Sequence, residues 1–422
     1  MPCTVVGAIP EGEIGVPDID ARTLRDRTAI VGVGATPYYR RGASAPQTVL
    51  ELAGKAILAA LADAGLSCDD IDGFALYSGG GIDVALLSQT LGIPDVRFTA
   101  TLTGGGGGAA GAVGLAAAAI VSGHADVVVS VMAMQQAATS RFGSAFARRA
   151  PGAYSAPPTP ESDFITHSGL MGPGQMFAIL TQRHMYKYGT TRDHLAEVAI
   201  STRENARNRP SALMRSPLTK EDYFAARMIS EPFCLFDYCL ECDGAVAVVT
   251  TSSARARDLR QPPVYVTASA QGGAGNWGQS ITWMGMPDEI FASSGHRPVA
   301  QDLYRRAGLG PADVDVALIY DHFTGMVLMQ LEDYGFCPIG ESGPFVADGN
   351  IRYLGGKIPV NTHGGNLSDA YIIGFTHVVE AVEQLRGTAI NQVANAEVAL
   401  VTGGPAPLPL SGLILKREAS GG

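Results

Sequence analysis

The sequence is poor in features that mark several protein classes. It has 422 residues but only 6 cysteines and 17% charged side chains, with 40 Asp and Glu against 30 Lys and Arg. Six cysteines in a chain of this length do not make a disulfide framework, so we expect free thiols in a reducing cytoplasm. A net charge of −10 without a dense basic run argues against binding to a nucleic-acid backbone.

Long apolar runs are also missing. The longest stretch without a polar side chain, Ala109 to Val121, is interrupted by glycines and is shorter than the roughly 20 residues of a membrane span. We therefore expect a buried helix there and no span. Glu11 and Glu13 stand where an export signal has a cationic start, so no such signal is expected. Residues 1–27 are interpreted as an extended arm.

Apolar material is plentiful and regularly arranged. Hydrophobic residues make up 46% of the chain, enough for a large core. Apolar β-branched runs alternate with helical patterns, which indicates a mostly parallel sheet covered by helices. The first helix is predicted to have Ser44 as its N-cap and to stop at Gly65. Strands are predicted at Thr28–Gly34, Gly73–Tyr77, Asp126–Met132, Val264–Ala268, Val314–Tyr320 and Glu397–Thr402.

The chain contains an internal repeat. The segment from Ala64 to Tyr77 aligns without a gap with the segment from Ala307 to Tyr320; both have an Ala-Gly-Leu helix stop, an acidic turn and a strand ending on tyrosine. A second pair, starting at Ala125 and Ala396, follows in the same order. We therefore predict two similar α/β halves, residues 28–259 and 260–422. A polar insertion at about 135–235 interrupts the first half.

Four motifs resemble those of a known family. Their order matches the thiolase superfamily, and the likeness, from about residue 28 to the end, is greatest to the sterol-carrier-protein thiolase-like group, which includes bacterial enzymes of steroid side-chain breakdown. The resemblance implies a duplicated five-layered α-β-α-β-α fold with an inserted loop domain, acyl-CoA ligands and a dimer with joined central sheets. It also suggests a small OB-fold and zinc-ribbon partner protein. The motifs are Ile120-Val-Ser-Gly123, Asp243-Gly-Ala-Val-Ala-Val, Asn361-Thr-His-Gly-Gly365 and Val401-Thr-Gly-Gly404.

Sulfur is missing from the positions where this family carries its reactive thiols. A thiolase has a cysteine at the start of a buried helix, where amide dipoles stabilise the thiolate. The family's spacing before Ile120 puts Gly106 at that position. The second thiolase cysteine is missing from the segment 400–404, which contains Thr402 instead. The covalent nucleophile is therefore absent.

Two tyrosines occupy the remaining catalytic positions of the family. Tyr371 stands where the resemblance places a histidine, and Tyr320 stands at the oxyanion-binding position, at the start of Tyr-Asp-His-Phe. Retro-aldol cleavage needs no nucleophile, only a base for the hydroxyl proton, donors for the enolate oxygen and an acid for carbon. The superfamily's steroid-degrading aldolases resemble this pattern; they cleave a 17-hydroxy side-chain acyl-CoA to a 17-ketosteroid and propionyl-CoA.

The two phenols are given different roles as a hypothesis. A phenolate base at neutral pH requires the pKa to fall from about 10 to about 7, which costs roughly 4 kcal/mol, and burial acts in the opposite direction. Tyr371 is predicted at the start of a helix running to about Leu385, where the helix dipole favours negative charge, so it is the better base. Tyr320 then acts as a donor or carbon acid. The reverse assignment stays open.

Further polar groups are expected around the pocket. The amides of Gly106 and Gly403 are predicted to face the thioester oxygen of the substrate. Asp321, His322 and His363 are possible pocket residues. Since adjacent residues of an extended chain point to opposite sides, Asp321 and His322 are not expected to form a dyad.

The other histidines and the clustered cysteines receive structural interpretations. His124 and His377 are interpreted as helix-end and surface residues. Cys234, Cys239 and Cys242 have no fourth Cys or His nearby, so buried thiols are favoured over a zinc site. We expect no metal and no cofactor.

The sequence thus predicts a cytoplasmic, homodimeric aldolase acting on a bulky β-hydroxyacyl-CoA. Two alternatives stay open. One is a thiolase-like acyltransferase with an unconventional nucleophile such as Thr402. The other is a non-catalytic lipid- or acyl-CoA-binding protein that has lost its cysteine.

Overall fold

The computed structural model describes residues 24–77, 81–103, 108–136, 167–170, 172–273, 291–404 and 409–419. The strands in these ranges are β1 (Thr28–Ala35), β2 (Tyr39–Arg40), β3 (Gly73–Tyr77), β4 (Phe98–Leu102), β5 (Val127–Met134), β6 (Met228–Ser230), β7 (Phe233–Cys234), β8 (Cys242–Ser252), β9 (Val264–Gly272), β10 (Val316–Leu318), β11 (Val398–Gly403) and β12 (Leu410–Lys416). The α-helices are α1 (Val49–Ala64), α2 (Val84–Leu91), α3 (Gly108–Val121), α6 (Pro173–Tyr188), α7 (Arg192–Arg207), α8 (Lys220–Ala225), α9 (Ser253–Ala256), α11 (Arg297–Ala307), α12 (Thr324–Asp333), α13 (Ser342–Ala347) and α14 (Phe375–Arg386).

Ten strands form one sheet whose order shows an internal repeat. The order is β10-β11-β12-β9-β1-β8-β5-β3-β4, with β2 paired to β8. In the first half, β1 and β8 are antiparallel, β8 and β5 are antiparallel, and β5 and β3 are parallel. The second half repeats this pattern with β9, β12, β11 and β10. The two halves meet where β1 pairs with β9.

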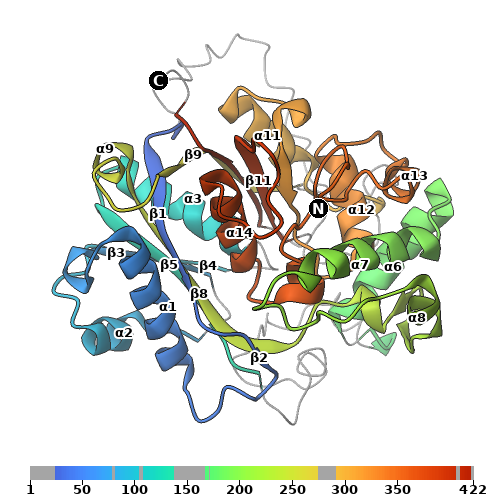
Figure 1. The fold of residues 1–422 in the computed structure, drawn as a ribbon, viewed down its shortest axis with the longest axis horizontal. Helices are drawn as coiled ribbons and strands as arrows, with labels where there is room; N and C mark the ends of the chain where they lie inside the picture. Colours follow the sequence, from blue (N-terminus) through green and yellow to red (C-terminus); the bar gives the residue numbers. More distant parts are fainter. Residues whose placement is uncertain are drawn as a thin grey trace, which may run out of the picture.

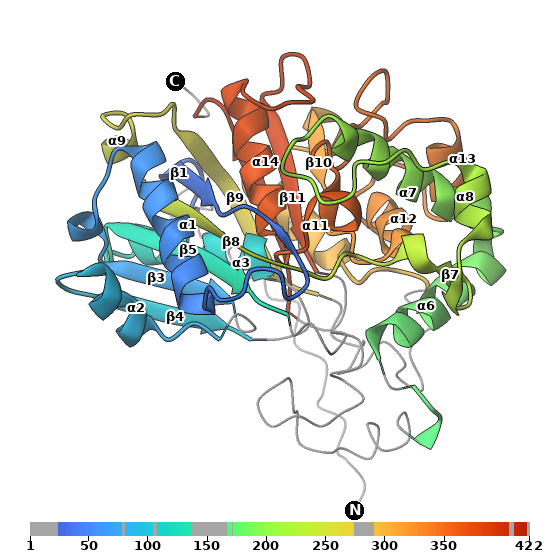
Figure 2. The same ribbon diagram turned by 60° about the horizontal axis from the view of Figure 1, so that its bottom comes forward.

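Helices cover both halves and fill the space between them. Helices α3 and α14 contact strands of both halves, and they lie at the centre of the molecule in Figure 1. Helix α1 packs on β1, β8 and β5, while α11 packs on β9 and β12. Figure 2 shows α1 and α11 on opposite sides of this centre. The layers therefore run α-β-α-β-α, and the predicted thiolase fold class is confirmed. The prediction of a mostly parallel sheet was wrong, because among the described strands of this sheet only β3 with β4, β3 with β5 and β10 with β11 are parallel.

The repeated sequence segments have the same local structure. Helices α1 and α11 both end at a glycine in the left-handed region, Gly65 with φ 75° and Gly308 with φ 67°. Asp72 and Asp315, the second aspartates of the two turns, each accept hydrogen bonds from two successive backbone amides at the start of β5 and β11. The repeat in the sequence therefore marks the carboxylates that align neighbouring strands.

The first helix begins later than predicted. Its N-cap is Thr48, whose hydroxyl accepts from the Glu51 amide while the Glu51 carboxylate accepts from the Thr48 amide. Ser44 instead donates its hydroxyl to Asp243 of β8, at 2.8 Å. The N-cap prediction was wrong because a long-range hydrogen bond occupies the serine.

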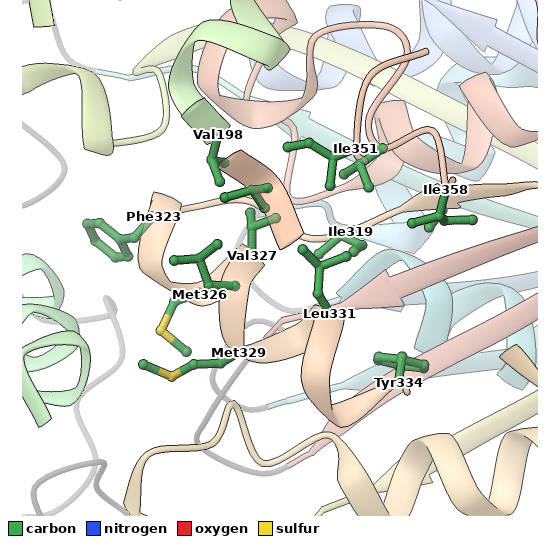
Figure 3. Close-up of a cluster of buried hydrophobic side chains, with 14 of the residues drawn as sticks. Val198, Ile319, Phe323, Met326, Val327, Met329, Leu331, Tyr334, Ile351 and Ile358 are labelled. Carbon is green, nitrogen blue, oxygen red and sulfur yellow. The ribbon is translucent and has the colours of Figure 1, made fainter. Parts of the chain in front are cut away.

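The insertion of the first half packs against the second half. Helices α6 and α7 contact α12, and α7 also contacts α13 (Figures 1 and 2). Figure 3 shows Val198 of α7 beside Met326 and Val327 of α12, within a cluster of buried apolar side chains. Residues 137–166 of the insertion lie outside the described ranges. The predicted domain boundaries stay a prediction.

Across the described ranges, no helix has both the length and the apolar character required to cross a bilayer.

Candidate active site

Two buried phenols meet at the centre of the candidate site. The hydroxyl oxygens of Tyr320 and Tyr371 lie 3.0 Å apart and share a hydrogen bond. Only 2% of Tyr320 and 7% of Tyr371 is exposed. The structure therefore brings together the two tyrosines that the sequence singled out, although they are far apart along the chain.

The backbone of Tyr320 is held from both sides. Its amide donates to Thr402 Oγ1 of β11 at 2.9 Å, and its carbonyl accepts from Gln330 Nε2 of α12, also at 2.9 Å. Thr402 in turn donates to Gln330 Oε1 at 2.6 Å. Because strand β10 ends at Leu318, Tyr320 lies two residues beyond the strand, not at its last position as predicted. The hydrogen bonds among Tyr320, Thr402 and Gln330 replace the strand-to-strand hydrogen bonds that the Tyr320 backbone would make within a sheet.

Tyr371 lies between two helices. The π-helix Gly365–Asp369 precedes it, and α14 begins only at Phe375, with Gly374 as N-cap. The prediction that a helix starts at Tyr371 was therefore wrong, and the helix-dipole argument for this residue as base loses its structural basis. The thiol of Cys242 fixes the segment instead, accepting from the Tyr371 amide at 3.2 Å and donating to its carbonyl at 3.5 Å.

A glycine makes room for the tyrosine pair. Gly374 has φ 76°, in the left-handed region, and a Cβ built on it would lie 2.9 Å from Cδ2 of Tyr320. Both the backbone conformation and the contact with the aromatic ring therefore require glycine.

Burial sets the protonation state of one phenol. Burial raises the pKa of Tyr320 well above its usual value of 10, and the neighbouring Tyr371 and the Cys239 thiol raise it further. Tyr320 is therefore a neutral phenol near pH 7 and can donate a hydrogen bond or a proton. A phenolate at this position is disfavoured by desolvation.

Asp321 points away from His322, as the alternation of an extended chain predicts. Its carboxylate accepts from the amides of Asn366 at 2.8 Å and Leu367 at 3.3 Å, and it contacts His377 Nε2 at 3.1 Å. The same carboxylate fits under the π-helix because a Cβ on Gly365 would lie 2.0 Å from its Oδ2. Asp321 therefore anchors the π-helix that leads to Tyr371.

His377 is a functional-site residue that the sequence analysis missed. It was interpreted as a surface residue, yet it is fully buried on α14. Its Nε2 lies 3.0 Å from the Ile319 carbonyl, so this nitrogen carries the proton and also faces Asp321. The misreading came from expecting a solvated helix face, whereas a helix between two sheet layers has none. The predicted five-layered fold could have indicated this burial, because it contains helices between two sheet layers.

Two histidines predicted for the pocket are buried, and no described residue is their hydrogen-bond partner. Among the described residues, neither ring nitrogen of His322 or of His363 has a hydrogen-bond partner. The His322 ring lies against Tyr320, with centroids 5.3 Å apart, and the His363 ring lies 4.8 Å from that of His377. Burial lowers the pKa of His322 to about 3, so its imidazole is neutral. An unsatisfied buried polar group costs about 1–3 kcal/mol, so such groups suggest a binding function.

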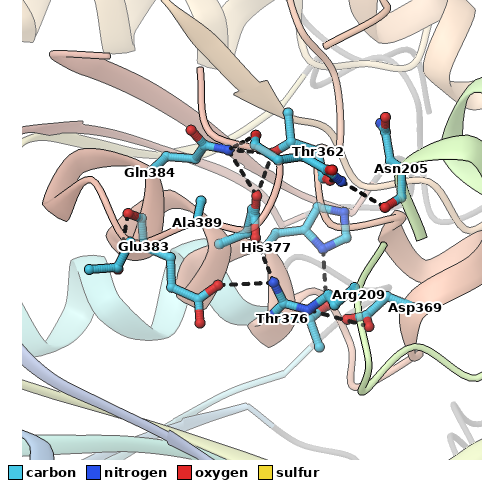
Figure 4. A network of polar contacts seen from close by, with 12 residues as sticks. Asn205, Arg209, Thr362, Asp369, Thr376, His377, Glu383, Gln384 and Ala389 are labelled. Carbon is cyan, nitrogen blue, oxygen red and sulfur yellow. Dashed lines mark hydrogen bonds and ion pairs between the residues drawn. The ribbon is translucent and has the colours of Figure 1, made fainter. Parts of the chain in front are cut away.

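A buried charge cluster holds the segment that carries Tyr371 (Figure 4). Arg209, from the insertion, contacts Glu380 and Glu383 of α14 at 2.9 Å each and Asp369 at 3.6 Å. Burial raises the pKa of Asp369 to about 8, and the neighbouring glutamates add to this effect while Arg209 opposes it. One arginine thus links the π-helix and α14 on either side of Tyr371.

The predicted amide donors are only partly visible. Gly106 lies outside the described residues. Gly403 is the last residue of β11, is buried and pairs with Ser411 of β12. The carbonyl of the next residue, Gly404, accepts from His296 Nε2. The roles of both predicted glycine amides stay a prediction.

The cysteines of the middle region are thiols near the site. Cys234 and Cys242 are buried and Cys239 is half-buried, and all three are free. Within the described ranges, no group of three or more His, Cys, Asp and Glu is arranged to hold a metal ion. Cys242 is hydrogen-bonded to the Tyr371 backbone and Cys239 raises the pKa of Tyr320, so two thiols lie near the phenol pair. Burial raises the pKa of the Cys239 thiol well above its usual value, which makes it a poor nucleophile near pH 7.

Thr402, the alternative nucleophile, is fully engaged in structure. Its side chain is completely buried, accepts from the Tyr320 amide and donates to Gln330. No group in these contacts can remove its proton, since the partners are an amide nitrogen and a carboxamide oxygen. The geometry therefore favours proton transfer by the two phenols over acyl transfer through Thr402.

Comparisons with known proteins agree with the fold. Residues 28–214 match the model of the thiolase N-terminal domain, and residues 273–408 match that of the thiolase C-terminal domain-like family. A 17-hydroxy-3-oxo-4-pregnene-20-carboxyl-CoA lyase of Mycobacterium tuberculosis is 40% identical over 403 residues, which cover 93% of this chain and 100% of the relative.

Two further similarities involve proteins named as aldolases. A steroid side-chain-cleaving aldolase of Thermomonospora curvata is 39% identical over 395 residues, which cover 93% of this chain and 98% of the relative. The solved structure of an Ltp2-ChsH2(DUF35) aldolase matches with a TM-score of 0.83 and 36% identity, covering 93% of this chain and 98% of that chain.

Proposed function

Because this chain belongs to the thiolase family, and its similar relatives include named steroid side-chain lyases, we propose that it is a carbon–carbon lyase. Its reaction is the retro-aldol cleavage of a bulky β-hydroxyacyl-CoA, a 17-hydroxy steroid side-chain CoA ester. The products are a ketone and a short acyl-CoA such as propionyl-CoA. The observation that carries the proposal is the Tyr320–Tyr371 hydroxyl pair at 3.0 Å, between the two residues that the resemblance predicts at catalytic positions.

The proposed reaction consists of two proton transfers around one bond cleavage. A base takes the proton of the β-hydroxyl, and the electron pair left on that oxygen forms the carbonyl of the ketone. The Cα–Cβ bond breaks, and its electrons enter the thioester as an enolate. An acid then returns a proton to Cα, which completes the acyl-CoA product. The thioester itself is the electron sink, so the proposal includes no cofactor.

The two phenols supply the proton transfers in this proposal. Tyr371 is assigned as base and Tyr320 as the neutral donor and carbon acid. The raised pKa of Tyr320 supports its half of the assignment, because a neutral phenol keeps its proton until the enolate forms. The shared hydrogen bond gives a path by which the proton taken by one phenol reaches the other. The amides of Gly106 and Gly403 are assigned to the enolate oxygen.

The proposed assembly includes two kinds of partner. Strand β4 is the last strand of the sheet and its residues are exposed or half-exposed, so its open edge is where a second copy extends the sheet into a homodimer. The solved Ltp2-ChsH2(DUF35) aldolase supports a small partner protein, which we propose to be an OB-fold and zinc-ribbon protein. We further propose that the assembly works in the cytoplasm.

The experiment that tests the function compares two substrates. The purified chain, alone and with candidate small partners, is incubated with a 17-hydroxy steroid side-chain CoA ester and with its 17-deoxy analogue. Mass spectrometry should detect the 17-ketosteroid and propionyl-CoA from the hydroxy substrate only, because the analogue has no hydroxyl proton to remove. Binding of both esters without cleavage of either would instead support the non-catalytic acyl-CoA-binding alternative.

A further inference from the structure

We propose that the imidazole of His322 donates a hydrogen bond to the thioester oxygen of the substrate as the enolate forms. This inference rests on the proposed aldolase function and adds a residue to it. His322 would then be a catalytic residue, because it touches the atom on which negative charge develops.

His322 lies on the same side of the chain as Tyr320. The two residues are two positions apart in the segment that follows β10, and their ring centroids are 5.3 Å apart. The intervening Asp321 points to the π-helix, as its contacts show. The rings of Tyr320 and His322 therefore lie together at the candidate site, while the carboxylate of Asp321 contacts the π-helix.

Aromatic rings enclose the imidazole. Phe177 of the insertion meets it edge-on with centroids 4.4 Å apart, and Phe323 lies at 4.6 Å. No described residue offers either ring nitrogen a hydrogen bond, and only 9% of the residue is exposed. A polar ring in such a place stays unsatisfied until a ligand with a polar atom arrives.

The other buried histidines make this lack informative. His184 contacts Thr190 and Glu332, His296 contacts Tyr334 and Gly404, and His377 contacts Ile319 and Asp321. His363 shares the absence of described partners, but among these two only His322 is in ring contact with Tyr320.

The chemistry of a neutral imidazole suits an enolate oxygen. Burial lowers the pKa of His322 to about 3, so the ring carries one N–H and no positive charge near pH 7. It can donate a strong hydrogen bond to a developing oxyanion without giving up its proton. The two phenols are assigned to the hydroxyl proton and to protonation of carbon, so His322 is assigned to the thioester oxygen, where it adds a side-chain donor to the proposed amides of Gly106 and Gly403.

The test replaces His322 by phenylalanine, which suits the aromatic surroundings. Because the imidazole makes no hydrogen bond to any described residue, the melting temperature of His322→Phe should equal or exceed that of the wild type. With the 17-hydroxy steroid CoA ester and the partner protein present, kcat should fall about 100- to 1000-fold, as on removal of an oxyanion donor. KM should change little. His322→Gln, which keeps an N–H donor, should recover part of the rate.

The matched control is His184→Phe. His184 is also buried, but it is hydrogen-bonded at both nitrogens, to Thr190 and Glu332. This variant should melt at a lower temperature and keep the wild-type kcat per folded molecule. A lower melting temperature in His184→Phe, but not in His322→Phe, distinguishes a structural histidine from a ligand-binding one.

Each failure has its own signature. Wild-type kcat in His322→Phe, beside an active wild type, would overturn the role of His322 and leave the aldolase intact. A lower melting temperature in both His322→Phe and His322→Gln would make the histidine structural and overturn the inference as well. No ketone from the wild-type complex would overturn the aldolase function, and the inference with it.

Discussion

The hydroxyl of Tyr320 is hydrogen-bonded to the hydroxyl of Tyr371, over 3.0 Å, in an interior from which water is largely excluded. The two residues are 51 positions apart in the chain. Neither phenol depends on the other for its backbone position: Thr402 and Gln330 hold one, and Cys242 holds the other. The pair can therefore be altered one hydroxyl at a time.

Removing either hydroxyl should abolish most of the proposed turnover. We expect Tyr320→Phe and Tyr371→Phe each to lower kcat by about 100-fold or more, because each loses one proton-transfer group. Circular dichroism and melting temperature should change little. The matched control is Tyr304→Phe, which removes a phenol that donates to the Tyr334 carbonyl outside the site and should leave kcat unchanged. Near-wild-type rates in both site variants would refute the assigned roles.

Gly374→Ala should damage the site more than the fold. The new methyl group would meet the Tyr320 ring at 2.9 Å, on a backbone with φ 76°. Gly387, at the other end of the same helix, has φ 74° and nothing within 4 Å of a built Cβ. Both variants carry the backbone strain, about 1 kcal/mol in unfolding experiments. Only Gly374→Ala should also lose activity, by about 10-fold or more; equal activity would mean that the ring contact is dispensable.

The free energy of unfolding should depend on Asp369. Its pKa rises from 3.8 in an unfolded chain to about 8 in the fold. Between these values the folded protein keeps a proton that the unfolded chain has lost, so this residue makes stability fall as pH rises from about 4 to about 8. Asp369→Asn removes that titration, and its stability relative to the wild type should increase by about 1–3 kcal/mol between pH 5 and pH 8.

Urea unfolding at several pH values measures this difference. Asp302 provides the control, since Arg305 and Arg306 beside it help hold the pKa of its carboxyl below 3.8 against the effect of burial. Its contribution is present above about pH 4 and is lost only in acid, so Asp302→Asn should show a constant difference between pH 5 and pH 8. The same constancy in Asp369→Asn would show that Asp369 is ionised in the fold.

The acyltransferase alternative predicts a covalent adduct that the geometry disfavours. After incubation with acyl-CoA, the intact mass of the wild-type protein should be unchanged, because Thr402 lacks a base and Cys239 is a neutral thiol. Thr402→Val should lower stability by about 1–3 kcal/mol, since the Tyr320 amide and Gln330 each lose a partner. A mass increase that disappears in Thr402→Val or Cys239→Ser would favour acyl transfer instead.

The strands and the tyrosine pair were predictable for a physical reason. Buried strands such as β3 and β11 are continuous apolar runs between turns, and the repeated aspartates Asp72 and Asp315 mark where those turns cap the next strand. Family spacing then located Tyr320 and Tyr371. The sequence could not place the start of α14, because a π-helix precedes it and Gly374 begins it in the left-handed region.

What the sequence missed depends on contacts between distant segments. Ser44 has the local sequence of a helix N-cap, but its hydroxyl donates to Asp243, a residue distant in the sequence. His377 was interpreted as a surface residue, but the packing of α14 buries it completely. The part played by Arg209 has the same origin, since its three carboxylates come from two other elements. Local patterns carry no information on such pairings, whereas the layer order of the fold does.

The position of Arg209 has a consequence for how the protein becomes active. The residue belongs to the insertion in the first half, and the neighbouring Leu213 and Met214 donate their amides to the carbonyls of Asp369 and Ser368, just ahead of Tyr371. During synthesis Arg209 is made before Asp369, Glu380 and Glu383, so it can contact these carboxylates only after most of the second half has been made. A chain that ends before Glu380 lacks the contacts that hold the segment carrying Tyr371, and we expect it to be inactive.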